Sequence, residues 1–277
     1  MADWRYKLKR RDDGFPRIMG VVNVTPDSFH PDSRSNNLES AVTRAKKMVE
    51  EGAEWLDIGG ESTRPGSEPV STEEELRRVV PVIERVRFEI PEVCISVDTR
   101  RASVARKSLE AGADLVNDVS SLGDPEMIEV VANFECPICV MHMQGKPENM
   151  QNDPRYGNVV EEVREFLSET CEKLLGAGIK HSQIVVDPGI GFGKKLEHNL
   201  ALLSSGRGIV PDERLGLLWG VSRKRMFWDL LGRENSGERL SGTLGIASRA
   251  PEKGVDIIRV HDVSDHSDLY SAMSAIR

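Results

Sequence analysis

The sequence has few cysteines, no excess of basic residues and no long apolar run. Only four cysteines occur among its 277 residues, which is typical of a protein kept in a reducing compartment. No apolar run approaches the ~20 residues that a membrane-spanning helix needs, and residues 1–16 lack the apolar core of a signal peptide. We therefore expect a cytoplasmic protein without a membrane partner.

The shortage of basic residues bears on the choice of partner. Lys and Arg number 37 against 45 Asp and Glu, so the net charge is −8, whereas a protein that binds nucleic acid is usually basic. A few arginines can still create a local anion site. Hydrophobic residues make up 39% of the chain, enough for a core, and we expect residues 1–277 to form a single domain.

One pair of cysteines, Cys136 and Cys139, has the C-x-x-C spacing of redox and metal sites. No second pair is present to complete a zinc site. Cys139 continues into the apolar run ICVM, which is typical of a buried strand. We expect these thiols to be structural.

One pattern recurs along the chain: a short apolar run ends in polar residues, and a segment with helical spacing follows. The apolar runs are 17–24, 54–60, 94–99, 114–120, 137–143, 183–189, 217–222 and 255–263. Strands that are apolar without alternation indicate a parallel sheet buried on both faces. Eight such units predict an α/β fold, the (β/α)8 TIM barrel, with an open doubly wound sheet as the alternative. We expect a short N-terminal strand or hairpin to close the bottom of the barrel.

Capping signals and turn residues mark the ends of the predicted helices. Thr72 and Glu75 have the spacing of a capping box. Glycines stand where helices should end, at Gly52, Gly112, Gly178 and Gly254. Long polar connections follow three strands, at 25–38, 61–71 and 144–158. All three follow the C-terminal ends of strands, the face on which such barrels carry their sites.

Polar side chains also stand at the end of every predicted strand. They are Asn23, Asp57, Asp98, Asn117, Asp118, His142, Asp187, Ser222, Arg223, Lys224, Arg259, His261 and Asp262. Each of them alone could simply cap a helix or form a turn. In a barrel they converge on one mouth, where several carboxylates without partners would be costly. We therefore infer a shared site at that mouth.

The side chains of this mouth divide by chemistry. Acceptors for a planar ligand rich in N–H groups are Asp57, Asp98, Asn117 and Asp187. Cations that suit an anionic group are Arg64, Lys224, Arg259 and His261. No close Asp/His cluster predicts a tight metal site, but Asn23 and phosphate oxygens could hold Mg²⁺ loosely.

Eight motifs in this order resemble the dihydropteroate synthase family. They are NVTPDSF (23–29), DIGGESTRPGS (57–67), SVDT (96–99), NDVS (117–120), MHMQG (141–145), DPGIGFGK (187–194), SRK (222–224) and RVHD (259–262). Any one of them would be weak, but eight in register across nearly the whole chain are specific. The resemblance implies a TIM barrel, usually a homodimer and a sulfonamide target. It implies a transferase of folate biosynthesis that joins 6-hydroxymethyl-7,8-dihydropterin pyrophosphate to p-aminobenzoate, releasing pyrophosphate.

The resemblance also implies roles for individual residues. The pterin would be bound by Asp57, Asp98, Asn117, Met141, Asp187, Phe192 and Lys224. The pyrophosphate would be held, with Mg²⁺ beside Asn23, by Asn23, Thr63, Arg64, Arg259 and His261. The p-aminobenzoate site would include Phe29, Pro65 and Ser222. Catalysis would fall to Asn23, Arg64, Lys224, Arg259 and His261.

The glycine-rich stretch 187–194 fits neither the dinucleotide spacing G-x-G-x-x-G nor the nucleotide loop G-x-x-x-x-G-K-[ST]. Since a carboxylate, Asp187, opens it, we interpret the stretch as one wall of the pterin pocket. The glycines would let the backbone turn sharply and pass close to a flat ring, with Phe192 packed beside that ring.

The resemblance has one departure. After NVTPDSF the family usually continues with Ser-Asp-Gly-Gly, whereas this chain reads HPDSRSNN at 30–37. The loop is expected to order on substrate binding, so the missing glycines should affect turnover more than pterin binding. Two alternatives stay open: a pterin-binding paralogue without catalysis, and a methyltetrahydrofolate-type methyltransferase barrel, which has no need of the pyrophosphate-side Arg64 and His261.

Overall fold

The structure of the chain is a computed structural model. It describes residues 3–24, 34–62, 69–145 and 149–276, with the backbone alone for residues 34–37. The strands are β1 Arg17–Asn23, β2 Trp55–Gly59, β3 Cys94–Asp98, β4 Leu115–Asp118, β5 Ile138–Met141, β6 Ile184–Asp187, β7 Gly216–Trp219 and β8 Ile257–Val260. The α-helices are α1 Arg34–Glu50, α2 Thr72–Glu89, α3 Ala102–Glu110, α4 Met127–Phe134, α5 Val159–Gly176, α6 Leu196–Ser205, α7 Met226–Leu231, α8 Leu240–Ala247 and α9 Val263–Ala275. The 3-10 helices are η1 Trp4–Tyr6, η3 His181–Gln183, η4 Gly206–Ile209 and η5 Ser236–Arg239.

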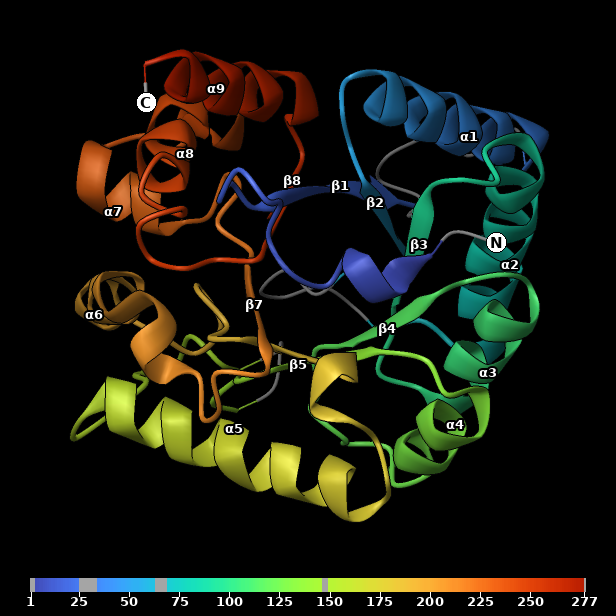
Figure 1. The fold of residues 1–277 in the computed structure, drawn as a ribbon, viewed down its shortest axis with the longest axis horizontal. Helices are drawn as coiled ribbons and strands as arrows, with labels where there is room; N and C mark the ends of the chain where they lie inside the picture. The colour runs from blue at the N-terminus through green and yellow to red at the C-terminus, as the bar shows by residue number, and fades with distance from the viewer. Residues whose placement is uncertain (1–2, 25–33, 63–68, 146–148, 277) are drawn as a thin grey trace.

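The strands form a closed parallel barrel with the helices in an outer ring (Figure 1). Each strand pairs with the next along the chain, and β8 pairs back with β1. That last pairing excludes the open sheet and confirms the TIM barrel. The predicted strands agree with the observed ones to within a few residues, because each is a continuous buried run.

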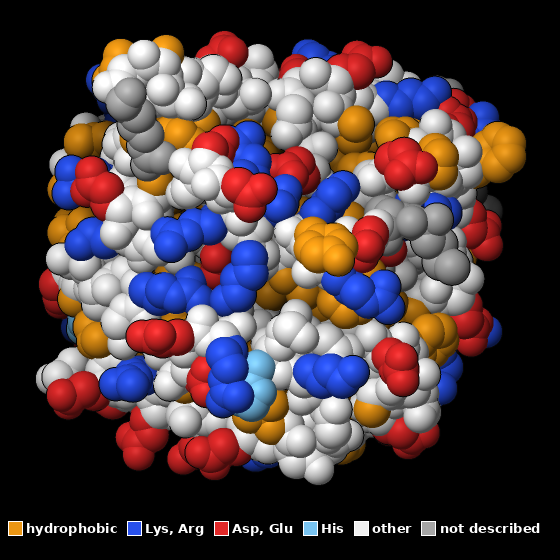
Figure 2. Space-filling model, in the orientation of Figure 1, with side chains coloured by type: hydrophobic (Ala, Val, Ile, Leu, Met, Phe, Trp, Pro, Cys, Tyr) orange, Lys and Arg blue, Asp and Glu red, His pale blue; other side chains and the backbone are white. Residues whose placement is uncertain are grey.

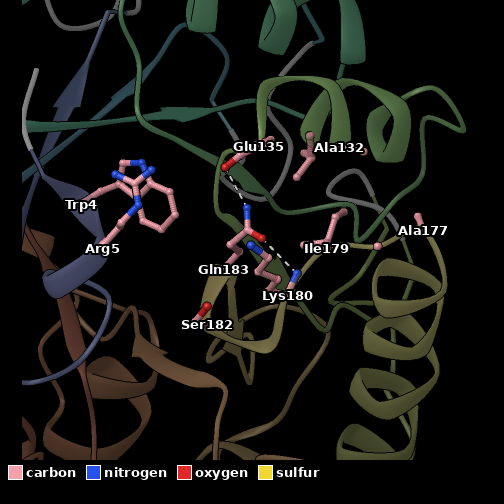
Figure 3. Close-up of a pocket in the computed structure, with 11 residues that line it drawn as sticks. Trp4, Arg5, Ala132, Glu135, Ala177, Ile179, Lys180, Ser182 and Gln183 are labelled. Carbon is pink, nitrogen blue, oxygen red and sulfur yellow. Dashed lines mark hydrogen bonds between the residues drawn. The ribbon is translucent and has the colours of Figure 1, made fainter.

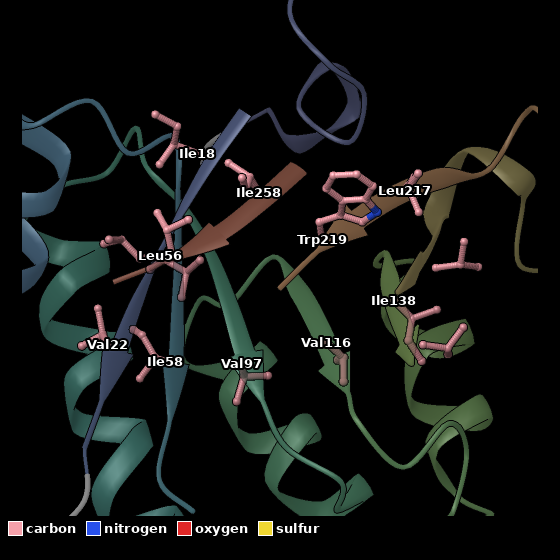
Figure 4. Close-up of a cluster of buried hydrophobic side chains, with 14 of the residues drawn as sticks. Ile18, Val22, Leu56, Ile58, Val97, Val116, Ile138, Leu217, Trp219 and Ile258 are labelled. Carbon is pink, nitrogen blue, oxygen red and sulfur yellow. The ribbon is translucent and has the colours of Figure 1, made fainter. Parts of the chain in front are cut away.

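Two layers of apolar side chains fill the barrel and its wall. One residue from every strand lies in the inner layer, namely Met19, Trp55, Cys94, Leu115, Cys139, Val185, Leu218 and Ile257. The strand residues labelled in Figure 4 belong to the outer layer, between sheet and helices. Complete burial of a large apolar side chain stabilises the fold by about 1.5–3 kcal/mol.

The C-x-x-C cysteines belong to different layers. Cys139 lies inside the barrel and Cys136 lies in the outer layer. Burial raises the pKa of the Cys136 thiol to about 12, so this thiol is a poor nucleophile and metal ligand. The expected buried strand after Cys136 is confirmed as β5, Ile138–Met141.

The N-terminal segment differs from the sequence prediction. Within residues 3–16 the structure has the 3-10 helix η1 and turns in place of the expected strand or hairpin. The reason is local hydrogen bonding: Lys7 N–H donates to Trp4 O at 2.8 Å, and Phe15 N–H donates to the Asp13 carboxylate at 2.9 Å. The segment still covers one mouth of the barrel, because Leu8 packs against the inner layer (Figure 1).

Basic side chains tie this segment to the barrel. In Figure 2, Lys and Arg side chains gather near the centre of the face over which η1 lies. Lys9 Nζ donates to the carbonyl of Leu215 and lies 3.8 Å from the Asp256 carboxylate. Arg17 Nε donates to Lys9 O at 2.8 Å. These charges therefore serve the fold. None of the described helices is long and apolar enough to cross a membrane.

Two helix starts also differ from the prediction. The cap of α2 is Ser71, whose side chain accepts from Glu74 N–H at 3.2 Å, one residue before the predicted capping box. Glu75 does not cap the helix, because its carboxylate turns inward to pair with Arg101. Helix α1 begins at Arg34, inside the segment 25–38 that the sequence predicts as a connection.

The glycines predicted to end helices are confirmed in the left-handed region of backbone conformation. The φ angles of Gly52, Gly112, Gly178 and Gly254 are +105°, +110°, +88° and +72°. A side chain is strained at such angles, so these positions suit glycine.

Candidate active site

The polar strand ends meet at the C-terminal mouth of the barrel, opposite the N-terminal segment. In the sheet register Asn23 lies beside Gly59, Gly59 beside Asp98, and Asp98 beside Asn117. This aligns the ends of β1 to β4 at one level. On the other side of the barrel Met141 lies beside Asp187.

Arg259 joins two of these carboxylates across the mouth. Its Nε donates to Asp57 Oδ2 at 2.5 Å, and its Nη2 donates to Asp98 Oδ2 at 2.7 Å. Asn117 Nδ2 donates to the same oxygen of Asp57 at 3.2 Å. Three strands and β8 thus contribute to one hydrogen-bonded group, which we call the Arg259 cluster: Asp57, Asp98, Asn117 and Arg259.

The electrostatics of this cluster favour a bound polar ligand. Burial raises the pKa of Asp98 to about 7, although the charge of Arg259 opposes the shift. Burial alone would lower the pKa of Arg259, but Asp57 and Asp98 raise it, so the guanidinium stays charged. The other oxygen of Asp57, Oδ1, is buried and has no hydrogen-bond partner within the described residues. A buried acceptor in this condition is costly unless a ligand donor reaches it.

The stretch 187–194 forms a wall of this mouth. Asp187 Oδ1 accepts from Gly189 N–H at 2.7 Å, which folds the chain back after β6. Gly189 and Gly193 have φ angles of +68° and +59°. A Cβ at Gly189 would lie 1.8 Å from the carbonyl oxygen of His142, and one at Gly193 would lie 2.4 Å from that of Gln144. The glycines are thus required by a close backbone contact with the segment after β5.

Side chains from neighbouring segments hold the backbone of this wall. Gly191 N–H donates to Asn199 Oδ1 at 2.8 Å, and Gly191 O accepts from Gln151 Nε2 at 2.7 Å. Gly193 O accepts from the Tyr156 hydroxyl at 2.8 Å. The wall is therefore preorganised from both sides.

Lys224 and Phe192 face each other beside this wall. Lys224 Nζ lies 4.2 Å from the centre of the Phe192 ring, a cation–π contact. Burial lowers the pKa of Lys224 to about 8, and the Asp187 carboxylate opposes the shift. Burial also raises the pKa of Asp187. Asp187 and Lys224 thus offer an acceptor and a donor next to the face of the Phe192 ring.

Lys194 is a buried lysine that sequence reasoning missed. Its Nζ lies 2.9 Å from His142 Nδ1 and donates to Phe192 O at 2.9 Å. Burial lowers the pKa of Lys194 to about 7, and burial together with the Lys194 charge lowers the pKa of His142 to about 3. The neutral ring can accept a hydrogen bond from the lysine, so Lys194 ties the wall to the segment after β5. Lysine is usually exposed, and nothing in the sequence marks this one as buried.

His261 and Ser222 lie together between β7 and β8. The Ser222 hydroxyl oxygen accepts from His261 N–H at 3.1 Å and lies 3.0 Å from His261 Nδ1. Burial, and then Arg259 and Arg223, lower the pKa of His261 to about 3. This pKa favours the neutral ring at pH 7, and the role of His261 toward an anion stays a prediction.

Comparison with known proteins identifies the family. The family profile described as "Pterin binding enzyme" matches residues 19–261. The dihydropteroate synthase of Escherichia coli (strain K12) is 46% identical over 266 residues, which cover 95% of this chain and 93% of that protein. That of Synechocystis sp. is 44% identical over 262 residues, covering 94% and 89%. The chain belongs to the dihydropteroate synthase family.

Solved dihydropteroate synthase structures have the same fold. The Xanthomonas albilineans enzyme with 4-aminobenzoic acid gives a TM-score of 0.88 at 41% identity, covering 95% of this chain and 93% of that one. The same enzyme in complex with 7,8-dihydropteroate gives 0.85 at 38% identity, covering 96% and 95%. These matches favour the synthase over the methyltransferase alternative.

Several residues to which the dihydropteroate synthase resemblance assigns roles cannot be placed. Phe29, Thr63, Arg64 and Pro65 lie outside the described residues. Met141 is buried at the end of β5. The structure thus brings together the pterin-side residues, Ser222, Arg259 and His261, with Asn23 half-buried at the end of β1.

A cavity of about 420 Å³ lies at the other end of this dihydropteroate synthase barrel, beside the N-terminal segment (Figure 3). Trp4, Arg5 and Gln183 are among the residues that line it. The Gln183 side chain is used within the fold, because it donates to Glu135 O at 2.8 Å and accepts from Lys180 N–H at 3.0 Å. This cavity holds none of the strand-end residues, and we assign the chemistry to the opposite mouth.

Proposed function

We propose that the C-terminal mouth binds 6-hydroxymethyl-7,8-dihydropterin pyrophosphate and joins it to p-aminobenzoate, giving 7,8-dihydropteroate and pyrophosphate. The observation that carries this assignment is the ring of buried acceptors around one mouth, completed by a lysine over an aromatic ring. A 2-amino-4-oxo pterin matches these acceptors and the lysine, because it presents several N–H donors and one carbonyl on a flat edge.

The pterin would lie between the Arg259 cluster and the stretch 187–194, which we call the glycine wall. Asp187 Oδ2, Asn117 and the free Asp57 Oδ1 are the acceptors for its N–H groups. Lys224 would donate to the carbonyl side, and its contact with Phe192 supports a place for both side chains beside the pterin. Because Asn117 is already hydrogen-bonded to Asp57 and Asp187 is held by Gly189 N–H, little reorganisation is needed on binding.

The pyrophosphate would lie on the side of β1 and β8. Arg259 uses Nε and Nη2 for the two carboxylates, which leaves Nη1 for a phosphate oxygen. His261 would add a neutral N–H donor, and Asn23, Thr63 and Arg64 would complete the anion site. Anchoring the anion assists the reaction because charge builds up on it as the bond breaks.

The reaction breaks the bond between the pterin methylene carbon and the bridging oxygen, and the electron pair leaves with pyrophosphate. Carboxylates of the Arg259 cluster would stabilise the cationic pterin. The p-aminobenzoate amine then forms the new C–N bond and loses one proton to solvent. An aromatic amine is already neutral at pH 7, so the step needs no strong base, and Ser222 would serve to position this substrate.

Mg²⁺ fits this site only as an ion shared with the substrate. The described residues contain no group of three or more His, Cys, Asp or Glu placed to hold a metal. The amide oxygen of Asn23 is a hard ligand, and phosphate oxygens would supply the others. When bound there, Mg²⁺ would neutralise charge on the leaving pyrophosphate.

Release of pyrophosphate from purified protein tests the function. With both substrates and Mg²⁺ present we expect steady release that depends on p-aminobenzoate. Tight binding of the pterin without release would instead support the non-catalytic paralogue. In that case the altered sequence at 30–37 would be the first place to restore the family pattern.

The pH dependence of pterin binding should report Lys224. Its pKa of about 8 means that the ammonium donor is present below pH 8 and is lost above it. The dissociation constant of the pterin should therefore be nearly level up to about pH 7, about double by pH 8 and about tenfold higher by pH 9. Fluorescence titration across pH 6.5–9.5 measures this. Lys224→Gln should bind more weakly and lose the step near pH 8; an unchanged step would assign it to another group.

We propose further that the protein is a homodimer through helix α7. Trp228, Leu230 and Leu231 form an exposed apolar group there, with exposed fractions of 39%, 44% and 47%. Exposed clusters of this kind are typical of interfaces.

Leu231→Asp should shift the protein from dimer to monomer, because it places a charge in an apolar interface. Light scattering after gel filtration measures the mass. A protein concentration of about 10 µM is well above the nanomolar Kd of a stable dimer. Phe88→Asp is the matched control, since Phe88 on α2 is 83% exposed and stands apart from α7. A monomeric parent protein would rule out this face. So would a Leu231→Asp variant that remains a dimer.

A further inference from the structure

Arg101 links the two ends of the segment 63–68. Glu61 lies just after β2 and Val70 lies just before α2, on either side of that segment. Arg101, between β3 and α3, donates from Nη1 to Glu61 Oε2 at 3.1 Å and from Nη2 to Val70 O at 2.6 Å. Val70 N–H in turn donates to Glu61 Oε1 at 3.2 Å. Three residues from separate elements thus close one hydrogen-bonded ring.

Further contacts hold this ring against the barrel. Arg101 also pairs with Glu75 of α2, whose side chain is fully buried. Arg100 donates to both oxygens of Glu61, at 3.0 and 3.1 Å. Burial alone would raise the pKa of Glu61, but the hydrogen bond from Arg100 and the charge of Arg101 lower it, so the carboxylate stays ionised. The Arg101 side chain is four-fifths buried, which makes its ion pairs stronger than exposed ones.

We propose that Arg101 is a positioning residue for catalysis, acting through the two ends of segment 63–68. This inference rests on the proposed function, which gives Thr63 and Arg64 to the pyrophosphate and Pro65 to p-aminobenzoate. Arg101 does not reach the Arg259 cluster by any hydrogen bond of the described residues. It fixes where the chain leaves the barrel after Glu61 and where it returns at Val70.

Arg101→Met should separate this role from pterin binding. We expect the KM for p-aminobenzoate to rise about tenfold or more, because small displacements of substrate-positioning groups are costly. The Kd of 6-hydroxymethyl-7,8-dihydropterin, which lacks the pyrophosphate, should stay within about twofold of the parent value. Arg101→Lys keeps the charge but reaches fewer acceptors, so it should restore the KM in part.

Two controls keep the test specific. Lys107→Met removes an exposed charge of α3 that pairs with Glu110, and it should change neither constant. Glu75→Gln lies in the same cluster but leaves the bonds of Arg101 to Glu61 and Val70 in place, so the KM should remain near the parent value. An equal rise of the KM in Glu75→Gln, or no rise in Arg101→Met, would overturn the proposal.

Hydrogen exchange at the Val70 amide gives a readout that does not depend on activity. Arg101→Met should speed this exchange at least about tenfold, because it removes the guanidinium that joins Glu61 to Val70 O, although Arg100 still pairs with Glu61. If the parent protein releases no pyrophosphate, the proposed function fails, and fast exchange at Val70 would still show the link. Unchanged exchange at Val70 would overturn the positioning role whatever the activity.

Discussion

Arg259→Met should lower kcat/KM by about a thousandfold or more, the largest loss of any single change considered for this site. The arginine holds two carboxylates that lie across the barrel mouth from β8, and it is the cation that both of them contact. Its removal would leave Asp57 and Asp98 buried and close together, and breaking a buried pair in this way costs about 3–5 kcal/mol. The same change removes a donor from the proposed pyrophosphate site.

Pyrophosphate release and urea unfolding together measure this effect. Arg249→Met is the control, since Arg249 pairs with Glu252 on the exposed surface and should leave activity unchanged. Arg259→Lys should fold better than the methionine variant but remain slow, because an ammonium cannot match both carboxylates with the same geometry. Near-normal turnover in Arg259→Lys would mean that only the charge is needed there.

Asp187→Asn should weaken pterin binding about thirtyfold, equivalent to about 2 kcal/mol. The asparagine keeps one acceptor for Gly189 N–H, so the turn after β6 should survive. It loses the charge that opposes the lowered pKa of Lys224 and points an N–H group at the donors of the ligand. The loss therefore falls on the pterin more than on the fold.

Calorimetric titration with the pterin measures the Asp187→Asn effect. Asp212→Asn is the matched control, because Asp212 pairs with Arg214 at the protein surface, away from the barrel mouth. Unchanged affinity in Asp187→Asn would remove this carboxylate from the pocket. A thermal unfolding curve close to that of the parent protein would show that the weaker binding does not come from partial unfolding.

The barrel could be predicted from the sequence because each strand is buried on both faces and therefore appears as a continuous apolar run. The N-terminal segment could not, since its conformation is set by single contacts such as the one between Asp13 and Phe15. The cap of α2 moved by one residue for a similar reason. Glu75 finds Arg101 as a partner, and that pairing joins positions 26 residues apart in the sequence.

The sequence predicts which strand ends carry the polar side chains of the candidate site, apart from Lys194, but not how these side chains pair. Strand order brings Asp57, Asp98 and Asn117 to one mouth, and the sequence shows this directly. That Arg259 lies between two of them depends on the closure of β8 onto β1. The burial of Lys194 depends on the approach of the wall to His142, which no local pattern records.

The glycine wall also limits how this protein can vary under selection. Every amino-acid change that one base substitution can make in a glycine codon adds a side chain. At Gly189 and Gly193 that side chain would collide with the backbone of the segment after β5. An inhibitor that rests on this wall should therefore leave few routes to resistance there. Resistance should arise instead in side chains that have room to change.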